Sequence, residues 1–257
     1  MKTHPLAVRE LQCGPYMLGL GKRTLIMGIL NVTPDSFSDG GLYFDKDKAV
    51  AHGEVLAESG ADIIDVGGES TRPFSDAVPA EEEMRRVVPV IAELTRRVSV
   101  PISIDTTKPT VAAGALDAGA VMINDIGALR LDPDMSALAA ERNVPVVLMH
   151  MKGTPKTMQK DPQYKDVVAE IRDFLADAIR RAEDAGVDRS KIIVDPGIGF
   201  GKTVTHNLVV IRELSALRAL GAPILIGPSR KSFIANVVGT ADEQRELGTQ
   251  AAVSIAA

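Results

Sequence analysis

Short apolar runs recur along the chain, and each of them stops at a polar residue or a glycine. They are rich in β-branched residues and apolar on both faces, which is typical of parallel strands that are covered on both sides. We therefore predict seven strands. Their sequences are TLIMGIL (24–30), DIIDV (62–66), PISID (101–105), VMIND (121–125), PVVLM (145–149), KIIVD (191–195) and PILIG (223–227).

The segments between these runs show a different pattern, in which apolar residues recur about every 3.6 positions. This spacing predicts helices over 48–60, 84–98, 109–119, 135–143, 167–186 and 207–221, and two further helical stretches over 229–239 and 245–257. Several of these helices end in glycine, the usual C-cap. Glycines and a proline near positions 14 to 21 predict an N-terminal hairpin within residues 1–23.

The order of strand and helix is repeated seven times without a linker or a shift in composition, which predicts a single domain over residues 1–257. A TIM (β/α)8 barrel fits this order, and a doubly wound sheet is the alternative. A complete barrel needs an eighth unit of roughly 30 residues. We therefore expect an α/β TIM barrel that lacks the eighth β/α unit in the given chain, with a truncated C-terminus.

Composition narrows the possible partners. The 257 residues carry a net charge of -5, contain no Trp and are 4% aromatic, which argues against a nucleic-acid surface. Cys13 is the sole cysteine, so an intrachain disulfide is impossible. The sequence has no signal peptide and no run of about 18 apolar residues. We expect no membrane partner and a cytoplasmic location.

The carboxyl ends of the predicted strands gather polar residues. In a parallel barrel these ends face one shared mouth. Asp105, Asn124 and Asp195 stand there, and such acceptors and donors suit a flat heterocycle whose edge carries N–H and C=O groups. Any one of them alone could be a turn residue or a helix N-cap. The set of three indicates a binding site.

Cations accompany these polar residues. Arg72 follows the second strand, and Arg230 and Lys231 precede a helix at whose start Ser232 stands. A helix start favours an anion. Each cation alone could equally be a solvated loop charge. The stretch PGIGFGKT (196–203) resembles a phosphate-binding loop, but Pro196 occupies the place of its first glycine, so we interpret it as a different glycine-rich turn. The four histidines lack zinc-site spacing.

Seven motifs in order resemble the dihydropteroate synthases, a family of pterin-binding TIM-barrel enzymes. The motifs are GILNVTPDSFSDGG (28–41), IIDVGGESTRP (63–73), SIDTTKP (103–109), INDI (123–126), LMHMKGTPKTMQ (148–159), VDPGIGFGKT (194–203) and SRKSFI (229–234). The resemblance implies a transferase of folate biosynthesis and a sulfonamide target. Its reaction would condense 6-hydroxymethyl-7,8-dihydropterin diphosphate with p-aminobenzoate, with Mg2+, to give 7,8-dihydropteroate and pyrophosphate.

The resemblance also implies roles for individual residues. The pterin would be bound by Asp105, Asn124, Asp195 and Lys231 in a slot lined by Met149, Phe200 and Gly227, and p-aminobenzoate by Thr71, Arg72, Pro73, Phe37 and Ser232. Asn31 would meet Mg2+ on the diphosphate, and Arg72, Lys231 and Asp105 would carry the catalytic roles. Two loops, after the first and second strands, would close over the site. Family members commonly form homodimers through their late helices.

Two rival interpretations stand beside this one, and a departure from the family supports the first of them. The family's eighth strand supplies an Arg-x-His motif that grips the diphosphate, and this chain ends before it. The chain could therefore be a relative that binds pterin without turnover. The other rival is a pterin-fold methyltransferase, which shares the Asp and Asn contacts but has no need for the NVTPDSFSDGG and SRKS loops.

Overall fold

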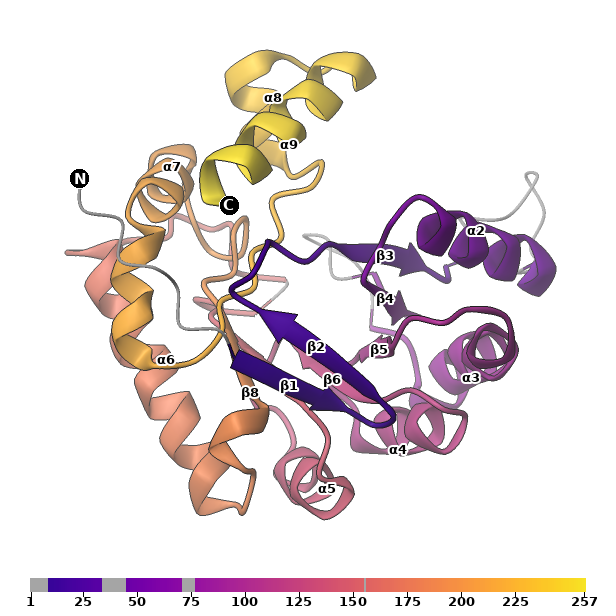
Figure 1. Cartoon of the computed structure of the whole chain (residues 1–257). Coiled ribbons are helices and arrows are strands. Elements are labelled where there is room, and N and C mark those ends of the chain that lie inside the picture. Colours follow the sequence, from indigo (N-terminus) through magenta and orange to yellow (C-terminus); the bar gives the residue numbers. More distant parts are fainter. Residues whose placement is uncertain (1–8, 34–44, 71–76, 155) are drawn as a thin grey trace.

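The central feature of the fold is a curved parallel sheet (Figure 1). The computed structural model describes residues 9–33, 45–70, 77–154 and 156–257. Six strands pair in chain order, β3-β4-β5-β6-β7-β8, and every pair is parallel. Their bounds are β3 (Met27–Asn31), β4 (Ile63–Gly67), β5 (Ile102–Asp105), β6 (Met122–Asp125), β7 (Val146–Met149) and β8 (Ile192–Asp195). A doubly wound sheet reverses its strand order at a switch point, so the unbroken order identifies the barrel architecture.

The prediction of a full seventh strand over 223–227 is wrong, because the segment forms an isolated bridge instead. Segment 223–227 meets β8 through an isolated parallel bridge between Val194 and Ile224. Val194 N donates to Pro223 O at 2.9 Å, and Leu225 N donates to Val194 O at 2.9 Å. Pro223 has no N–H to give, and within the described residues no strand pairs with the outer side of the segment. In the part of the chain that the structure describes, the barrel wall is therefore open between this segment and β3.

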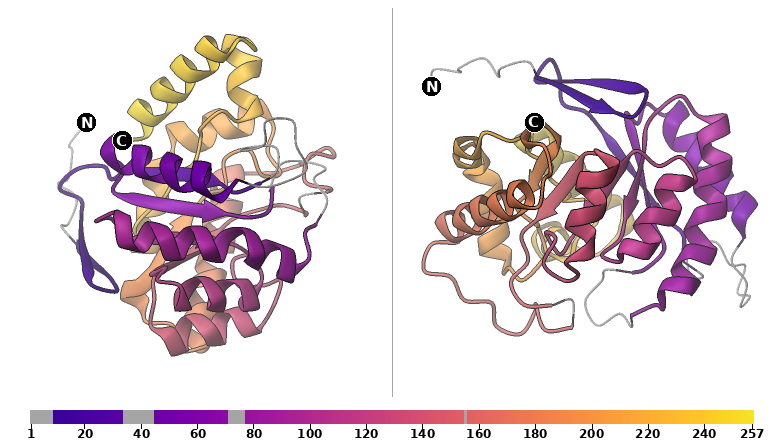
Figure 2. Two further views of the ribbon diagram at one scale, coloured as in Figure 1. Left: turned by 90° about the vertical axis from the view of Figure 1, so that its right-hand side faces the viewer. Right: turned by 90° about the horizontal axis from the view of Figure 1, so that it is seen from below.

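Helices cover the outer face of the sheet, where Figures 1 and 2 show them following the strands around the barrel. They are α2 (Lys46–Glu58), α3 (Ala80–Arg97), α4 (Pro109–Asp117), α5 (Asp134–Arg142), α6 (Val167–Asp184) and α7 (Val204–Arg212). The helix predicted over 207–221 is interrupted. Glu213 has φ −107° and ψ 19°, and a 3-10 helix, η2 (Leu214–Leu220), follows it. The chain continues into α8 (Ser232–Val238) and α9 (Asp242–Ala256).

Two apolar clusters hold these layers together. The larger lies between the sheet and its helices, and includes the fully buried side chains of Ile64, Leu94 and Leu148. The smaller lies at the amino ends of the strands, below a hairpin of β1 (Arg9–Cys13) and β2 (Tyr16–Leu20). Lys191, just before β8, donates to Gln12 O at 2.7 Å and fastens the hairpin there. The hairpin closes the end of the barrel opposite the predicted site.

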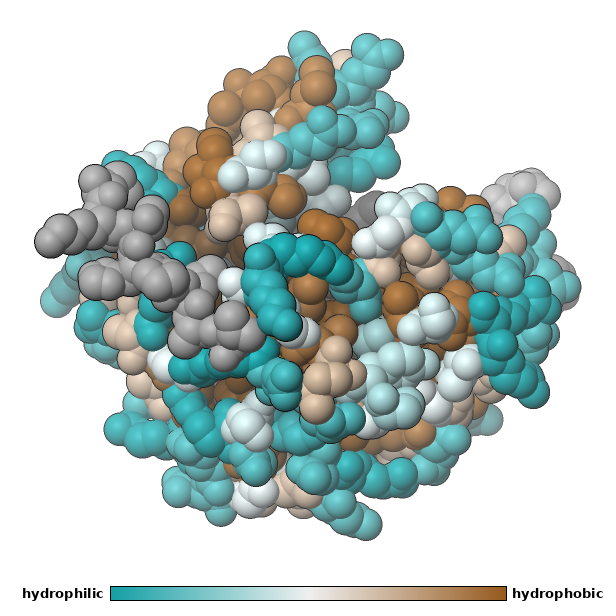
Figure 3. All heavy atoms as spheres, in the orientation of Figure 1, coloured by the Kyte–Doolittle hydropathy of each residue, from teal (hydrophilic) through white to brown (hydrophobic). Residues whose placement is uncertain are grey.

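The surface is apolar over the last two helices (Figure 3). Val237 and Val238 of α8, and Leu247 and Ile255 of α9, are exposed. Among the described helices, none is both long enough and apolar enough to cross a membrane.

Candidate active site

Polar side chains converge inside the barrel at the carboxyl ends of β4, β5 and β6. Asn124 Nδ2 donates to Asp65 Oδ2 at 2.9 Å. Strand β5 lies between the strands that carry these two residues, and Ser103 of β5 stands opposite Asp65 in the register. The hydrogen bond therefore crosses β5 on the inner face of the sheet. Asp105 pairs with Asn124 in the register, so it lies in the same group.

Asp105 Oδ1 is buried and has no hydrogen-bond partner among the described residues. Burial raises the pKa of Asp65 nearby, whereas hydrogen bonds from Ser103 and Asn124 lower it. Burial raises the pKa of Asp105 well above its ordinary value, and the negative charges of Asp65, Glu83 and Asp125 raise it further, whereas Lys231 lowers it. Buried polar atoms normally find partners. The inner wall of the site therefore offers acceptors to the N–H groups of a bound ligand.

Lys231 brings the positive charge to this group. It is the N-cap residue of α8, and its Nζ donates to Ile198 O at 2.5 Å and lies 4.6 Å from the centre of the Phe200 ring. Burial lowers the pKa of Lys231 to about 8, against the opposing effect of Asp195 and Asp105. A Cβ on Gly227 would lie 3.7 Å from Lys231 Nζ, which places Gly227 beside the ammonium.

Asp195, the last residue of β8, completes the acceptor group. Its Oδ1 accepts from Gly197 N at 2.6 Å, and burial raises its pKa while Lys231 lowers it. One oxygen of the carboxylate is thus held by the chain. The second oxygen is left to meet a donor.

An apolar wall stands next to these polar groups. Met149 and Phe200 belong to one buried cluster. The other members of this cluster are Ile126, Met151 and Met158. Methionine side chains adapt to the outline of a ring and make favourable contacts with aromatic groups. A concave site with apolar walls and a few converging polar groups is typical of small-molecule binding.

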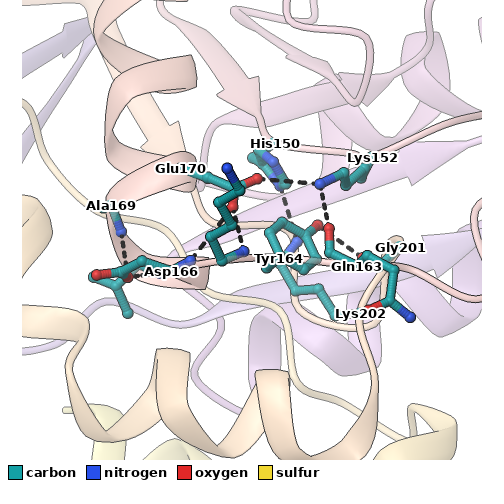
Figure 4. Close-up of polar contacts among 11 residues, drawn as sticks. His150, Lys152, Gln163, Tyr164, Asp166, Ala169, Glu170, Gly201 and Lys202 are labelled. Atoms are coloured by element: carbon teal, nitrogen blue, oxygen red, sulfur yellow. Dashed lines mark hydrogen bonds and ion pairs between the residues drawn. The ribbon is translucent and has the colours of Figure 1, made fainter.

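The glycine-rich turn after β8 packs tightly against the loop after β7. Gly197 and Gly201 have φ of 66° and 63°, and a Cβ on either would come within 1.9 Å of His150 O or 2.4 Å of Lys152 O. The Tyr164 hydroxyl donates to Gly201 O at 2.8 Å, and Lys152 Nζ lies 4.1 Å from the centre of the Tyr164 ring (Figure 4). The glycines therefore serve a backbone contact between two loops.

The predicted site residues fall into three groups. The structure brings together Asp105, Asn124, Asp195, Lys231, Met149, Phe200 and Gly227. Asn31 and Ser232 are exposed, and each lies at an element boundary: Asn31 is the last residue of β3 and Ser232 is the first residue of α8. Phe37, Thr71, Arg72 and Pro73 lie outside the described residues, as do residues 34–44 and 71–76 of the two predicted closing loops.

A metal site built by the protein alone is not found. Within the described residues, no group of three or more His, Cys, Asp or Glu side chains is arranged to hold a metal ion. Mg2+ in phosphate-handling sites takes one or two protein oxygens together with substrate phosphates and waters. Asn31 is exposed at the end of β3, and its amide oxygen is suited to be one of these few protein ligands.

Two residues of the site were given no role from the sequence. Asp65 holds Asn124 from within β4, and Lys202 lies buried behind the glycine-rich turn. The sequence did point to Asp65, because a carboxylate within an apolar run is seldom buried unless it is paired with another group. Lys202 was visible as the lysine of GFGKT. Its position in a stretch that is not a phosphate-binding loop gave no indication of its partners.

Known proteins resemble this chain along nearly its whole length. The family described as "Pterin binding enzyme" matches residues 27–257. The dihydropteroate synthase of Synechocystis sp. is 45% identical over 242 residues, covering 94% of this chain and 84% of that protein. The dihydropteroate synthase of Bacillus subtilis is 47% identical over 241 residues, covering 94% and 82%.

Solved structures show the same relation. Dihydropteroate synthase from Xanthomonas albilineans with 4-aminobenzoic acid has a TM-score of 0.90 at 49% identity, covering 97% of this chain and 89% of that one. The same enzyme in complex with 7,8-dihydropteroate has a TM-score of 0.86 at 47% identity, covering 96% and 88%. The Yersinia pestis enzyme in a sulfonamide drug complex has a TM-score of 0.90 at 43% identity, covering 96% and 89%.

Proposed function

The chain belongs to the family of pterin-binding enzymes, and from this membership we propose that it catalyses the dihydropteroate synthase reaction. Its substrates would be 6-hydroxymethyl-7,8-dihydropterin diphosphate and p-aminobenzoate, and its products 7,8-dihydropteroate and pyrophosphate. The observation that carries the proposal is the acceptor group of Asp105, Asn124 and Asp195, which faces Lys231 beside the wall of Met149 and Phe200.

This arrangement matches the hydrogen-bonding pattern of a pterin. The ring edge carries an amino group and ring N–H groups, which Asp195, Asn124 and Asp105 would accept. The Lys231 ammonium would donate to the ring carbonyl, and the flat faces of the ring would pack against Met149 and Phe200. Water would be excluded from the same surfaces, which strengthens each of these hydrogen bonds.

The chemistry proposed at this site needs little proton transfer from the protein. The C–O bond between the pterin methylene and the diphosphate breaks early, and the diphosphate leaves with the bonding electrons. The neutral arylamine then forms a C–N bond and releases its proton to water, so we assign no essential base. Arg72 would stabilise the charge that develops on the departing diphosphate. Asn31 would contribute one oxygen to Mg2+, and Mg2+ when bound neutralises diphosphate charge.

The second substrate would lie nearer the mouth of the barrel. Ser232 is exposed one residue after Lys231, and with Thr71, Arg72, Pro73 and Phe37 it would hold p-aminobenzoate. Sulfonamide analogues should compete there. We further propose a cytoplasmic protein that forms homodimers, which is consistent with the exposed apolar side chains of α8 and α9.

A product assay tests the proposal. The chain is incubated with the pterin diphosphate, p-aminobenzoate and Mg2+, and dihydropteroate and pyrophosphate are quantified. We expect equal amounts of both products, and none when p-aminobenzoate is omitted. A folded chain that binds pterin but forms no product would support the non-catalytic relative. Methyl transfer from methyltetrahydrofolate to a corrinoid would support the methyltransferase.

A further inference from the structure

Lys202 is a buried lysine to which the proposed reaction gives no role. Its residue is 3% exposed. Its Nζ lies 2.8 Å from Gly197 O, 3.0 Å from Phe200 O and 3.0 Å from His150 Nδ1. A lysine ammonium has three N–H groups, so these three acceptors use all of them. Lys202 therefore cannot serve a phosphate, although it stands in a stretch that resembles a phosphate-binding loop.

The three acceptors belong to two different loops. Gly197 and Phe200 lie in the glycine-rich turn after β8, and His150 directly follows β7 (Figure 4 shows His150 and Lys202 pointing toward each other). The backbone makes the same connection, because His150 N donates to Asp195 O at 2.9 Å. Lys202 thus ties the end of β7 to the turn that begins two residues after Asp195 and contains Phe200.

The histidine is suited to accept this hydrogen bond. Burial lowers the pKa of His150 to about 2, and the charges of Lys202, Arg130 and Lys152 lower it further. Its ring is therefore neutral, and in the tautomer that carries its proton on Nε2, Nδ1 accepts from the ammonium 3.0 Å away. The ring itself packs edge-on against Phe174, with centroids 4.8 Å apart. The position of Lys202 is therefore set from the β7 side as well as by the turn.

The charge of Lys202 also reaches the ligand-facing groups. It lowers the pKa of Asp195, as Lys231 does, against the effect of burial. Burial in turn lowers the pKa of Lys202 to about 7, while Asp195 raises it and Lys231 lowers it further. The Asp195 carboxylate is therefore influenced by two ammonium groups, those of Lys202 and Lys231. Both favour the ionised carboxylate that would accept N–H groups.

We propose that Lys202 is a positioning residue for pterin binding. It holds the glycine-rich turn against the end of β7, and through that turn it fixes Phe200 against Lys231 and keeps Asp195 in place as an acceptor. The inference rests on the proposed function, since it concerns the same slot. It adds a residue that touches no substrate and acts through Phe200 and Asp195.

The first test replaces Lys202 by methionine, which keeps the length of the side chain and removes the three donors. Binding of 6-hydroxymethylpterin is measured by calorimetry, and KM is measured for both substrates. We expect the Kd for the pterin and the KM for the pterin diphosphate to rise at least tenfold, while the KM for p-aminobenzoate changes less than threefold. Lys22→Met, at an exposed position on the hairpin side, is the matched control.

A pair of substitutions at His150 keeps the test decisive if Lys202→Met folds poorly. His150→Phe keeps an aromatic ring against Phe174 and removes the acceptor for Lys202. His150→Asn removes the ring and retains an acceptor oxygen near the position of Nδ1. We expect pterin affinity to be at least fivefold higher in the Asn variant than in the Phe variant. The reverse order would show that ring packing matters, and would overturn the proposal.

The outcomes separate this inference from the proposed function. Wild-type chain that binds no pterin contradicts the proposed function itself. Wild-type chain that binds pterin, with unchanged affinity in folded Lys202→Met, contradicts the positioning role alone. A loss of affinity for both substrates by the same factor would indicate general disruption of the barrel mouth and would also overturn the inference.

Discussion

Lys202 is buried and Lys231 is partly buried at the same end of the barrel, and their hydrogen-bond partners indicate different roles. Among the described residues, Lys231 Nζ has one hydrogen-bond acceptor, Ile198 O, and it lies over the face of Phe200. Lys202 has acceptors for all three of its N–H groups. Donors of Lys231 therefore remain for a ligand, whereas those of Lys202 are used within the protein.

The lowered pKa of Lys231 predicts a pH dependence of pterin binding. Its folded pKa of about 8 lies below the ordinary 10.5, so the ammonium is lost as pH rises through about 8. Between pH 7 and 9 we expect pterin affinity, measured by calorimetry, to fall about tenfold, because roughly a tenth of the group stays protonated one unit above its pKa. Lys231→Arg should keep its charge and lose the part of the fall that centres near pH 8. A fall that remains in this variant and centres near pH 7 would belong to Lys202.

The same shift has the opposite consequence for stability. Between pH 8 and 10.5 the unfolded chain holds more protons on this lysine than the folded chain, so the contribution of Lys231 to the free energy of unfolding rises with pH. A rise that persists in Lys231→Arg and begins near pH 7 would belong to Lys202. Affinity that rises from pH 7 to 9 in the wild type would contradict the donor role of Lys231.

At the scale of elements, local signals set most helix boundaries. Helix α6 begins after Asp166, whose side chain accepts from Val168 N at 3.1 Å and Ala169 N at 3.0 Å. Its apolar face supplies Ile171 and Leu175 to the main core. The predicted start of this helix is therefore confirmed, because both the cap and the periodicity are local properties of the sequence.

The cap of α6 predicts a measurable loss of stability. Asp166→Ala leaves two amide groups of the first turn without their side-chain partner. We expect the free energy of unfolding to fall by about 1 kcal/mol, the usual cost of losing a carboxylate N-cap. Urea denaturation followed by circular dichroism measures it. Asp184→Ala, exposed in the last turn of α6, is the control and should change stability by less than about 0.5 kcal/mol.

At the scale of the whole molecule, the hairpin closes one end of the barrel over Cys13. This residue is fully buried, together with Leu11, Met122 and Val147. Burial raises the pKa of the Cys13 thiol to about 11, against the effect of Lys191. The thiolate is the reactive form of a cysteine, so both burial and protonation protect it.

The sole thiol therefore reports on opening of the molecule. At pH 8 we expect a chromogenic disulfide reagent to label the folded chain at least about 100-fold more slowly than the chain in guanidinium, because the site must open first. The labelling rate should rise with denaturant. Cys13 could instead be labelled as fast as in the unfolded chain while circular dichroism shows intact helices. This result would mean that the packing of the hairpin does not shield the Cys13 side chain.

The sequence by itself determined the elements and their order. The six paired strands, the start of α6 and the start of α8 at Ser232 follow from apolar runs, helical periodicity and caps, all of which depend on residues close together in the chain. The parallel order then places strand ends at one mouth, so the gathering of Asp105, Asn124 and Asp195 could also be predicted.

Tertiary structure alone decided how that mouth is built. Segment 223–227 looks like the other strands in sequence, but it makes a single bridge, because a ladder needs neighbours that the segment cannot specify. Likewise Asp65 bonds Asn124 across 59 positions and Lys202 bonds His150 across 52. These contacts arise between residues distant in the chain, whose partners become defined once the barrel forms, and no local pattern encodes them.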